Sequence, residues 1–386
     1  MGRPMASDFE IFLAAPPGLE PLLCAEALEQ GFTGATETPG GVTFRGGWPD
    51  VWRANLMLRG ASRVLVRIGA FRALHVAQLD KRARRFDWAA CLRPDIPVRV
   101  EASCRASRIY HEGAVVQRIV RALREEAGIR ALTGLPEEGP CLTLKVRIED
   151  DLCTLSLDSS GEPLHRRGTK QAVAKAPMRE TLAALLLRAC DYSPGEAVVD
   201  PMCGSGTFVL EAAEIAADLP PGRSRSFAFE HLAGFDPAAW DWMRAAALPA
   251  TNGSPMDPIC LIGSDRDDGA IRAAQANAER AGVEGRVAFQ RRPVSEAEPP
   301  DGPPGLVIVN PPYGARIGDR KPLMALHGAL GARLRARFPG WRVGLVTATP
   351  ELARATGLPF GPPGPPIPHG GLKIRLYRTG PLPQTG

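Results

Sequence analysis

The segment Asn310-Pro311-Pro312-Tyr313 combines residue types that suit chemistry on an aromatic amine. Such an amine is a poor nucleophile while its lone pair is delocalised into the ring. If the Asn310 side-chain oxygen and the Pro311 carbonyl accept its two N–H bonds, the nitrogen moves toward a tetrahedral shape and its lone pair turns toward a methyl donor. Pro311 and Pro312 stiffen the turn, and Tyr313 can stack on the modified base. The segment predicts a catalytic site, the alternative being a simple Pro-rich turn.

A second turn follows the apolar residues Val198 and Val199 and opens a helix. Its glycines have no side chain, so the backbone can approach a nucleotide-like ligand closely. The residues predicted to bind this ligand are Asp200, Pro201, Met202, Cys203, Gly204, Gly206 and Thr207. Taken alone, the turn also fits a dinucleotide site or a strand-to-helix connection without any ligand.

Asp265 ends the next apolar run, where its carboxylate can accept hydrogen bonds from both hydroxyls of a ribose. An acid in this place is also common as the cap of the following helix, 269–281. Cys203 admits a nucleophilic role, as in enzymes that methylate pyrimidine carbon. No motif places a second cysteine or a base for that reaction, so the amine chemistry of Asn310 is favoured.

These turns belong to a region where strands and helices alternate, which predicts an α/β fold with a parallel sheet covered on both faces. The predicted strands are 197–200, 259–263, 287–289, 306–309, 343–347 and 372–377, and the predicted helices are 179–189, 207–217, 270–281 and 323–338. Two stretches dense in Pro and Gly, 292–305 and 357–371, are predicted to be loops.

The N-terminal half predicts two smaller α+β units. The first has strands at 9–13 and 42–44 around a helix at 19–30. The second has strands at 64–68 and 98–100, a helix at 115–127 and a hairpin formed by 142–148 and 153–157. Apolar periodicity is lost between Ser159 and Lys175, which predicts a linker.

Charge is unevenly distributed along the chain. The formal net charge is +5, yet residues 59–130 hold sixteen Lys and Arg against seven Asp and Glu. Such a basic stretch favours a polyanionic partner, although basic surfaces are often merely solvated. Within it, Lys81-Arg82-Ala83-Arg84-Arg85 is predicted to contact phosphate.

At 386 residues and 44% hydrophobic composition, the chain has the properties of a folded protein of two or three domains. No long apolar run and no signal peptide is evident, so a cytoplasmic location is expected. The eight cysteines form no Cys-x-x-Cys pair and lie near no His cluster, so neither disulfides nor a metal site is predicted.

The motifs together resemble those of class I RNA methyltransferases with an N-terminal THUMP domain, and most closely the 23S rRNA guanine-N2-methyltransferase family. The matching segments are 176–182, Asp200-Pro201-Met202-Cys203-Gly204-Ser205-Gly206-Thr207, Gly263-Ser264-Asp265, Asn310-Pro311-Pro312-Tyr313-Gly314, Phe227-Ala228-Phe229-Glu230 and Arg166-Arg167-Gly168. The resemblance covers nearly the whole chain.

This resemblance implies S-adenosylmethionine as cofactor, with its methionine part on the turn at 200–206, its ribose on Asp265 and the target base on 310–313. It also implies a ferredoxin-like unit at 7–58, a THUMP domain at 59–160, a linker at 161–175 and a Rossmann-like methyltransferase domain at 176–386. Many relatives carry an acid after the third strand, near the adenine. Here Phe289 is followed by Gln290-Arg291-Arg292, and the adenine contact is left unassigned.

The function expected from the resemblance is methylation of guanine N2 in structured RNA, with 23S rRNA as the first candidate and tRNA as the alternative. The same Asn-Pro-Pro-Tyr turn occurs in enzymes that methylate adenine in DNA or the glutamine amide of release factors. A non-catalytic RNA-binding protein that retains the fold is the remaining alternative, disfavoured by the intact Asp200, Asp265 and Asn310.

Overall fold

The computed structural model describes residues 8–132, 134, 139–168, 178–249, 260–313 and 320–384. The chain forms two compact units. The described residues of the first unit come from 1–15, 24–164 and 225–246, and those of the second come from 16–23, 165–224 and 247–386.

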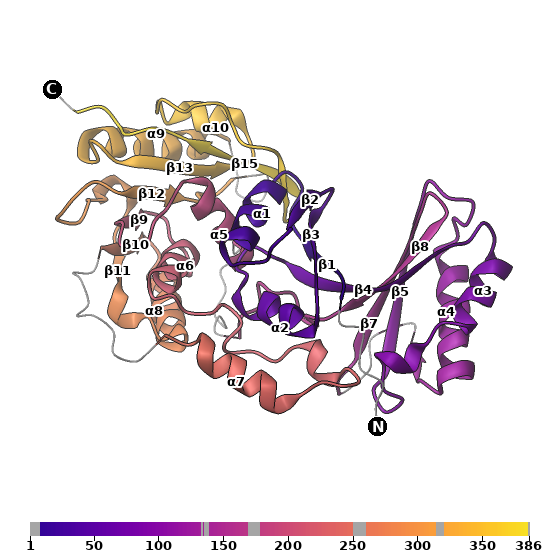
Figure 1. Cartoon of the computed structure of the whole chain (residues 1–386). Helices are drawn as coiled ribbons and strands as arrows, with labels where there is room; N and C mark the ends of the chain where they lie inside the picture. The colour runs from indigo at the N-terminus through magenta and orange to yellow at the C-terminus, as the bar shows by residue number, and fades with distance from the viewer. Residues whose placement is uncertain are drawn as a thin grey trace. The chain divides into compact units, whose positions relative to one another are not determined.

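The first unit is built on one eight-stranded sheet with the order β2-β3-β1-β4-β8-β7-β5-β6 (Figure 1). Its strands are β1 (Phe9–Ala14), β2 (Thr36–Thr38), β3 (Gly41–Gly46), β4 (Arg63–Arg72), β5 (Val98–Arg105), β6 (Ala131–Leu132), β7 (Leu142–Glu149) and β8 (Leu152–Asp158). The long strand β4 pairs with β1 on one side and with β8 on the other. The two α+β units predicted from the sequence therefore share a single sheet.

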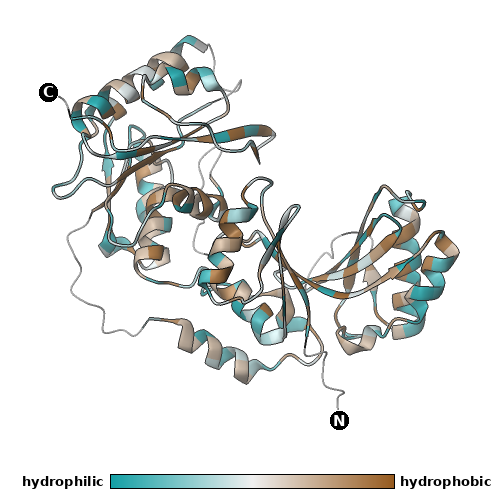
Figure 2. Cartoon of the chain, turned by 45° about the horizontal axis from the view of Figure 1, so that its top comes forward, coloured by the Kyte–Doolittle hydropathy of each residue, from teal (hydrophilic) through white to brown (hydrophobic). Residues whose placement is uncertain are grey.

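Helices cover one face of this sheet. They are α1 (Glu20–Glu29), α2 (Trp48–Met57), α3 (Val76–Arg84) and α4 (Glu112–Ala127), with a short 3-10 turn η1 (Trp88–Ala90) after α3. α4 buries an apolar stripe that includes Val115, Ile119 and Leu123, and it ends at Gly128 with φ of +64°. Figure 2 shows strands that mix hydrophobic and hydrophilic residues beside α3 and α4, and the two helices are largely hydrophilic.

A segment from the second half of the sequence completes the first unit. It contains η2 (Ala228–His231) and α7 (Pro237–Ala247). Trp240 of α7 packs against Trp52 of α2, with ring centroids 6.4 Å apart, and both rings contact Phe229. The sequence places this segment in the methyltransferase domain, whereas the fold groups it with the N-terminal strands. The four-part domain division stays a prediction.

The second unit contains a seven-stranded sheet with the order β11-β10-β9-β12-β13-β15-β14. Its strands are β9 (Val198–Asp200), β10 (Leu261–Asp265), β11 (Val287–Arg291), β12 (Leu306–Val309), β13 (Arg342–Thr347), β14 (Ile367–His369) and β15 (Leu372–Arg378). The first five are parallel, and β15 runs antiparallel to β13. The strand order reverses beside β9, which is where ligands bind in sheets of this kind.

The helices of the second unit are α5 (Glu180–Ala189), α6 (Thr207–Ala216), α8 (Asp268–Ala281), α9 (Arg320–Arg337) and α10 (Pro350–Ala355), with short turns η3 (Glu284–Arg286) and η4 (Val294–Glu296). The predicted α/β architecture with a parallel sheet is confirmed. The prediction that 357–371 is only a loop is wrong, because β14 pairs there with β15. No helix in the described part of the chain is long and apolar enough to cross a membrane.

Candidate functional site

The turn that follows β9 is held by its own backbone and by the neighbouring strand. Asp200 accepts a hydrogen bond from the Met202 N–H at 3.1 Å, and the Cys203 N–H donates to the Ser264 carbonyl at 2.9 Å. The Gly206 N–H donates to the Cys203 carbonyl at 2.8 Å. The turn is therefore fixed to the end of β10 before any ligand binds.

Gly206 must be glycine for two independent reasons. Its φ of +85° lies in the left-handed region that side chains disfavour. A Cβ at this position would also lie 2.9 Å from the Phe289 ring and 3.1 Å from the Cβ of Ala274. The backbone can adopt this path only without a side chain, which leaves its outer surface free to contact a ligand.

Asp265 connects the end of β10 to the same turn. Its Oδ2 accepts a hydrogen bond from the Gly204 N–H at 3.1 Å, and its Oδ1 accepts one from the Asp267 N–H at 2.9 Å. Asp265 is not the cap of α8. That role belongs to Asp267, which accepts hydrogen bonds from the N–H groups of Gly269 and Ala270.

The turn region holds two acidic side chains, of which Asp200 is buried and Asp265 is partly exposed. Burial raises the pKa of Asp200 to about 8, and the nearby Asp265 carboxylate adds to this shift. Burial, together with both carboxylates, also raises the pKa of the Cys203 thiol well above its usual value. A thiol held in its protonated form is a poor nucleophile, which disfavours the nucleophilic role considered for Cys203.

Asn310 follows β12, whose four residues are all buried. β12 and β9 run parallel, with Val307 level with Val199, so Asn310 and Asp200 lie at the same edge of the sheet. The Asn310 Oδ1 atom is buried and accepts no hydrogen bond from any residue that the structure describes. Leaving a buried acceptor unpaired costs free energy, so this atom is poised for a ligand donor.

Tyr313 lies close to Asn310 at the end of this segment. Burial raises the pKa of its hydroxyl to about 12, and the Asn310 side chain offsets part of the shift. The hydroxyl therefore stays protonated at neutral pH. Pro311 is buried, while Pro312 and Tyr313 are partly exposed. Gly314, the last residue of the motif, lies outside the described residues.

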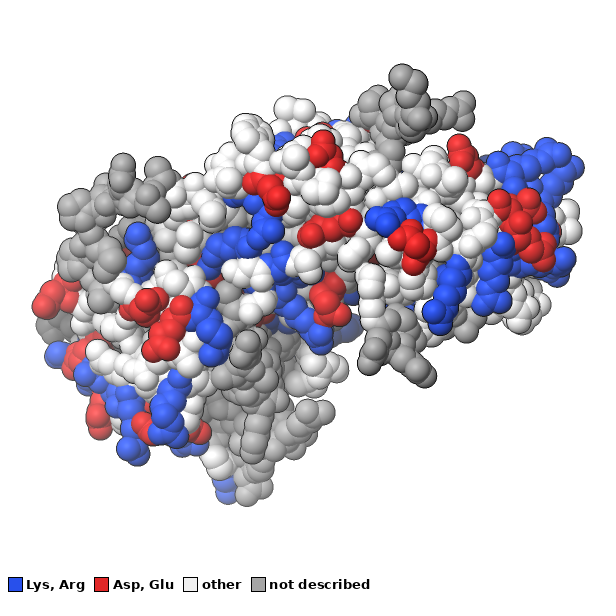
Figure 3. All heavy atoms as spheres, turned by 90° about the horizontal axis from the view of Figure 1, so that it is seen from below, with Lys and Arg blue, Asp and Glu red and all other residues white. Residues whose placement is uncertain are grey.

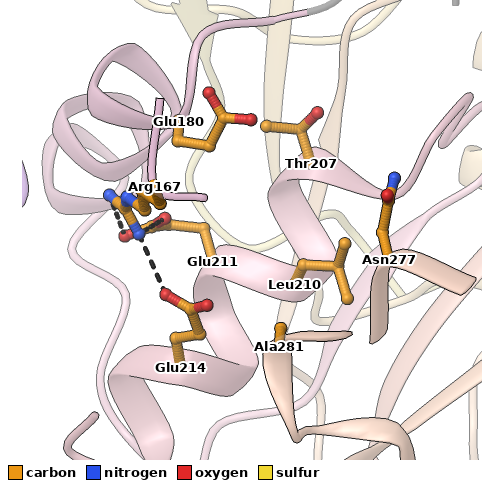
Figure 4. A pocket seen from close by; sticks show the side chains of 8 residues that line it. All are labelled: Arg167, Glu180, Thr207, Leu210, Glu211, Glu214, Asn277 and Ala281. Atoms are coloured by element: carbon orange, nitrogen blue, oxygen red, sulfur yellow. Dashed lines mark hydrogen bonds and ion pairs between the residues drawn. The ribbon is translucent and has the colours of Figure 1, made fainter. Parts of the chain in front are cut away.

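The predicted site residues thus divide into two groups. Asp200 to Gly206 and Asp265 are joined by direct hydrogen bonds, and Asn310 to Tyr313 follow the next strand of the sheet. Thr207 begins α6 and lines a small pocket with Arg167, Glu180 and Asn277 (Figure 4). Their use by a cofactor or substrate stays a prediction.

An ionic cluster that was not predicted from the sequence lies beside this pocket. The guanidinium of Arg167 is buried and contacts Glu211, with one N–O distance of 3.1 Å, and Glu214 at 3.0 Å (Figure 4). Glu214 also accepts a hydrogen bond from Arg223 at 2.9 Å. The signal in the sequence is two glutamates at i and i+3 on the otherwise apolar helix α6.

Comparison with known proteins addresses the origin of this arrangement. Residues 167–358 match the RMKL-like methyltransferase domain family, and residues 10–65 match the RlmL ferredoxin-like domain. The two matches together cover more than half of the chain.

The chain belongs to the RlmL-like methyltransferases.

Two relatives are named ribosomal RNA large subunit methyltransferase K/L. The protein from Syntrophotalea carbinolica is 37% identical over 366 residues, which are 92% of this chain and 51% of that protein. The protein from Methylococcus capsulatus is 35% identical over 383 residues, 97% of this chain and 51% of that protein. The chain therefore spans about half the length of these relatives.

Solved structures extend the likeness to nearly the whole chain. The crystal structure of SMU.472 complexed with SAH is 27% identical, with a TM-score of 0.84 over 99% of this chain and 100% of that one. A Listeria monocytogenes protein described as a predicted N6-adenine-specific DNA methylase is 29% identical, with a TM-score of 0.83 over 97% of each chain. TrmN from Thermus thermophilus, at 21% identity and a TM-score of 0.72 over 97% of this chain and 100% of that one, shares the fold.

Proposed function

We propose that this RlmL-like chain transfers a methyl group from S-adenosylmethionine to the exocyclic N2 of guanine in 23S rRNA. The observation that carries the proposal is the buried Oδ1 of Asn310 at the carboxyl edge of the sheet, which has no hydrogen-bond partner among the described residues. The names of the K/L relatives support large-subunit rRNA as the substrate class.

The turn at 200–206 and Asp265 suit the cofactor. The backbone of Gly206 has no side chain between it and a ligand, and Asp265 is partly exposed beside Gly204. The Asp265 carboxylate favours a ligand that carries positive charge, as S-adenosylmethionine does. The related SMU.472 structure holds SAH, the product of such a cofactor. When bound, the cofactor supplies an electrophilic methyl group.

The residues after β12 orient the nucleophile. In this proposal the Asn310 Oδ1 atom and the Pro311 carbonyl accept the two N–H bonds of the guanine amine, which turns its lone pair away from the ring. The Tyr313 ring stacks on the base, and Pro312 limits the movement of the turn. The amine becomes cationic as the new bond forms and then releases its proton readily, so no strong base is required.

The first unit would bind the RNA. The segment 59–160 carries the basic excess of the chain, and Lys81 and Arg82 of α3 are exposed. Arg84, by contrast, is occupied by ion pairs with Asp80, Glu125 and Glu126. Lys81 and Arg82 are therefore the better candidates for phosphate contacts within the stretch predicted from the sequence. We assign the THUMP role to this segment as part of the proposal.

The proposal is tested by incubating the full chain with labelled S-adenosylmethionine and, in separate reactions, unmodified 23S rRNA, tRNA and DNA. The products are digested to nucleosides and identified by mass spectrometry. N2-methylguanosine from 23S rRNA alone is the expected result. N6-methyladenine from DNA would instead support the activity described for the Listeria monocytogenes protein. If only tRNA is labelled, the proposed substrate changes from 23S rRNA to tRNA, and the proposed methylation of an amine is retained.

A further inference from the structure

We propose that RNA binds along the open face of the first unit's sheet, with a base stacked on Tyr110 at the end of this groove. The inference rests on the proposed function, because it assigns the surface that holds the RNA substrate. The groove has a volume of about 800 Å³ and lies over strands β1, β4, β5, β7 and β8. Its lining includes Phe12, Arg67, Lys145, Arg147 and Arg105.

The sheet has two different faces because residues alternate along each strand. Leu144, Val146 and Ile148 of β7 are buried, whereas Lys145 and Arg147 between them point to the other face. A sheet face that serves only as protein core would be apolar. This face instead carries cations, carboxylates and the hydroxyls of Ser103, Thr154 and Ser156.

Cations outnumber carboxylates on the groove floor in a repeated pattern. Glu101 lies between two cations, 2.6 Å from Arg99 and 2.6 Å from Lys145. Glu149 likewise lies 2.6 Å from Arg147 and 3.9 Å from Arg105. Each carboxylate is thus shared by two cations, and each group of three retains one positive charge. A backbone of phosphates complements such a floor.

At the end of β5 the groove meets a loop that is braced to the β7–β8 hairpin. The Ser107 hydroxyl donates to the Arg105 carbonyl at 2.7 Å and accepts the Asp151 N–H at 3.1 Å. Asp151 in turn accepts a hydrogen bond from the Arg108 N–H at 2.7 Å. Ala106 has φ of +47°, a conformation that costs about 1–2 kcal/mol for a residue with a side chain. The bracing holds this strained loop in one form.

This loop presents an aromatic ring to solvent. Tyr110 is 71% exposed, and its ring lies 4.1 Å from that of His111, centroid to centroid. The side chains of Arg105 and Arg108 in the same loop are 81% and 72% exposed. Arg105 lines the groove and ends β5, so Tyr110 belongs to the loop that directly follows the groove lining. An exposed ring near arginines matches the way proteins bind unpaired nucleotides. Figure 3 shows Lys and Arg side chains gathered toward the α3–α4 end of this unit.

RNA fits this surface better than a protein partner does. Protein interfaces have a core depleted of charge, whereas this groove combines apolar residues such as Phe12 and Leu65 with ion-paired cations and hydroxyls along its floor. The phosphates of a single-stranded segment would replace the carboxylates as partners of the cations, and one base would cover Tyr110.

The test measures the affinity of the full chain for a 23S rRNA transcript, together with methyl transfer to that transcript. Tyr110→Ala should weaken binding by a factor of roughly 5 to 100 and raise KM with little change in kcat, because base stacking contributes to binding alone. Tyr110→Phe should restore both values. Trp242→Ala removes another ring of similar exposure, 73%, from α7 and should change neither.

Arg147→Gln should lower the slope of log Kd against log salt by about one unit, because one phosphate contact is lost. Unchanged affinity in Tyr110→Ala, while the parent chain binds and methylates the transcript, would overturn the assigned surface and leave the proposed function intact. Loss of affinity in Tyr110→Ala without any methyl transfer by the parent chain would support the surface and overturn the proposed function.

Discussion

The Asp265 carboxylate accepts a hydrogen bond from the Gly204 N–H, 3.1 Å away, across 61 positions of sequence. The bond joins the end of β10 to the turn after β9, the two places where a ribose and a methionine group would lie. One oxygen of Asp265 is thereby held by the turn, and the other by the Asp267 N–H. A single carboxylate thus joins the turn to the residues that precede α8.

Asp265→Ala should lower the affinity for SAH by a factor of about 10 to 100, because hydrogen bonds to a charged group contribute roughly 1.5–3 kcal/mol. Calorimetric titration of the full chain measures the effect. Asp267→Asn is the matched control: it removes a neighbouring charge but keeps a good cap for α8, so SAH affinity should stay unchanged. Equal losses in both variants would show that charge near α8, rather than the Asp265 contact, governs affinity.

Asn310→Ala should reduce kcat by roughly 10²- to 10³-fold, the usual cost of removing a group that stabilises developing charge. Stability and SAH affinity should hardly change, because Oδ1 makes no hydrogen bond with the described residues. Asn55 offers a contrast, since its buried amide bonds to Val51, Ser159 and Ser160. Asn55→Ala should lower the melting temperature without a specific loss of kcat. Retained turnover in Asn310→Ala would contradict the assigned role.

The parallel sheet could be predicted from the sequence because its strands are short runs of buried residues, such as the four of β12, that end in polar turns. Helix α3 could not be recognised in the same way. Only Leu79 and Ala83 of its nine residues are fully buried, and its last turn is basic, so the apolar periodicity is weak. In helix α7, Trp240 is the single buried residue, so this helix also lacks an apolar stripe. One packing partner of Trp240, Trp52, lies in a distant part of the sequence.

The sequence was sufficient to predict which turns form the site. It was not sufficient to predict which hydrogen bonds and packing contacts hold them. Acids and glycines after successive strands indicate one sheet edge, but three acids at the start of α8, Asp265, Asp267 and Asp268, leave open which of them caps it. The structure selects Asp267 for the cap and Asp265 for Gly204. The Phe289 ring fills the space beside Gly206 and Gly263. This packing follows from the pairing of Phe289 with Gly263 in neighbouring strands, and the sequence alone does not reveal that register.

Gly206→Ala should lower the free energy of unfolding by more than the strain of a positive φ alone accounts for. The reason is that the new Cβ also meets the Phe289 ring. Gly282→Ala is the matched control, with φ of +69° and no atom within 4 Å of the added Cβ. The control should cost about 1–2 kcal/mol in urea unfolding, from strain only, and leave SAH affinity unchanged. Adding Phe289→Leu to Gly206→Ala should recover part of the excess. Equal costs for the two glycines would exclude the steric contribution.

Arg167→Met should destabilise the chain by about 3–5 kcal/mol, because it leaves the buried carboxylates of Glu211 and Glu214 with less compensation. The same ion pair on a surface contributes little. Arg272→Ala, which breaks an exposed i,i+4 pair with Asp268, should cost at most about 0.5 kcal/mol. Urea unfolding of both variants provides the comparison. A small cost for Arg167→Met would mean that water or Arg223 neutralises the two glutamates.

Asp200 should make the stability of the chain fall as pH rises from about 4 to about 8. An unfolded Asp ionises near pH 4, whereas burial raises the pKa of folded Asp200 to about 8, so between these values the folded state binds one more proton than the unfolded state. Its contribution is fully present below pH 4 and is lost by pH 8, with a slope of at most about 1.4 kcal/mol per pH unit.

Asp200→Asn keeps an acceptor for the Met202 N–H and cannot ionise, so it should remove this slope. Urea unfolding of both proteins across the pH range measures the difference, and parallel curves would mean that folded Asp200 is ionised throughout. A cationic ligand beside Asp200 should lower its pKa, so binding of the sulfonium compound S-adenosylmethionine near pH 7 should release a proton from the parent chain and not from the variant. Titration in buffers of different ionisation enthalpy detects that proton. Its absence in both proteins would place the positive group of the ligand away from Asp200.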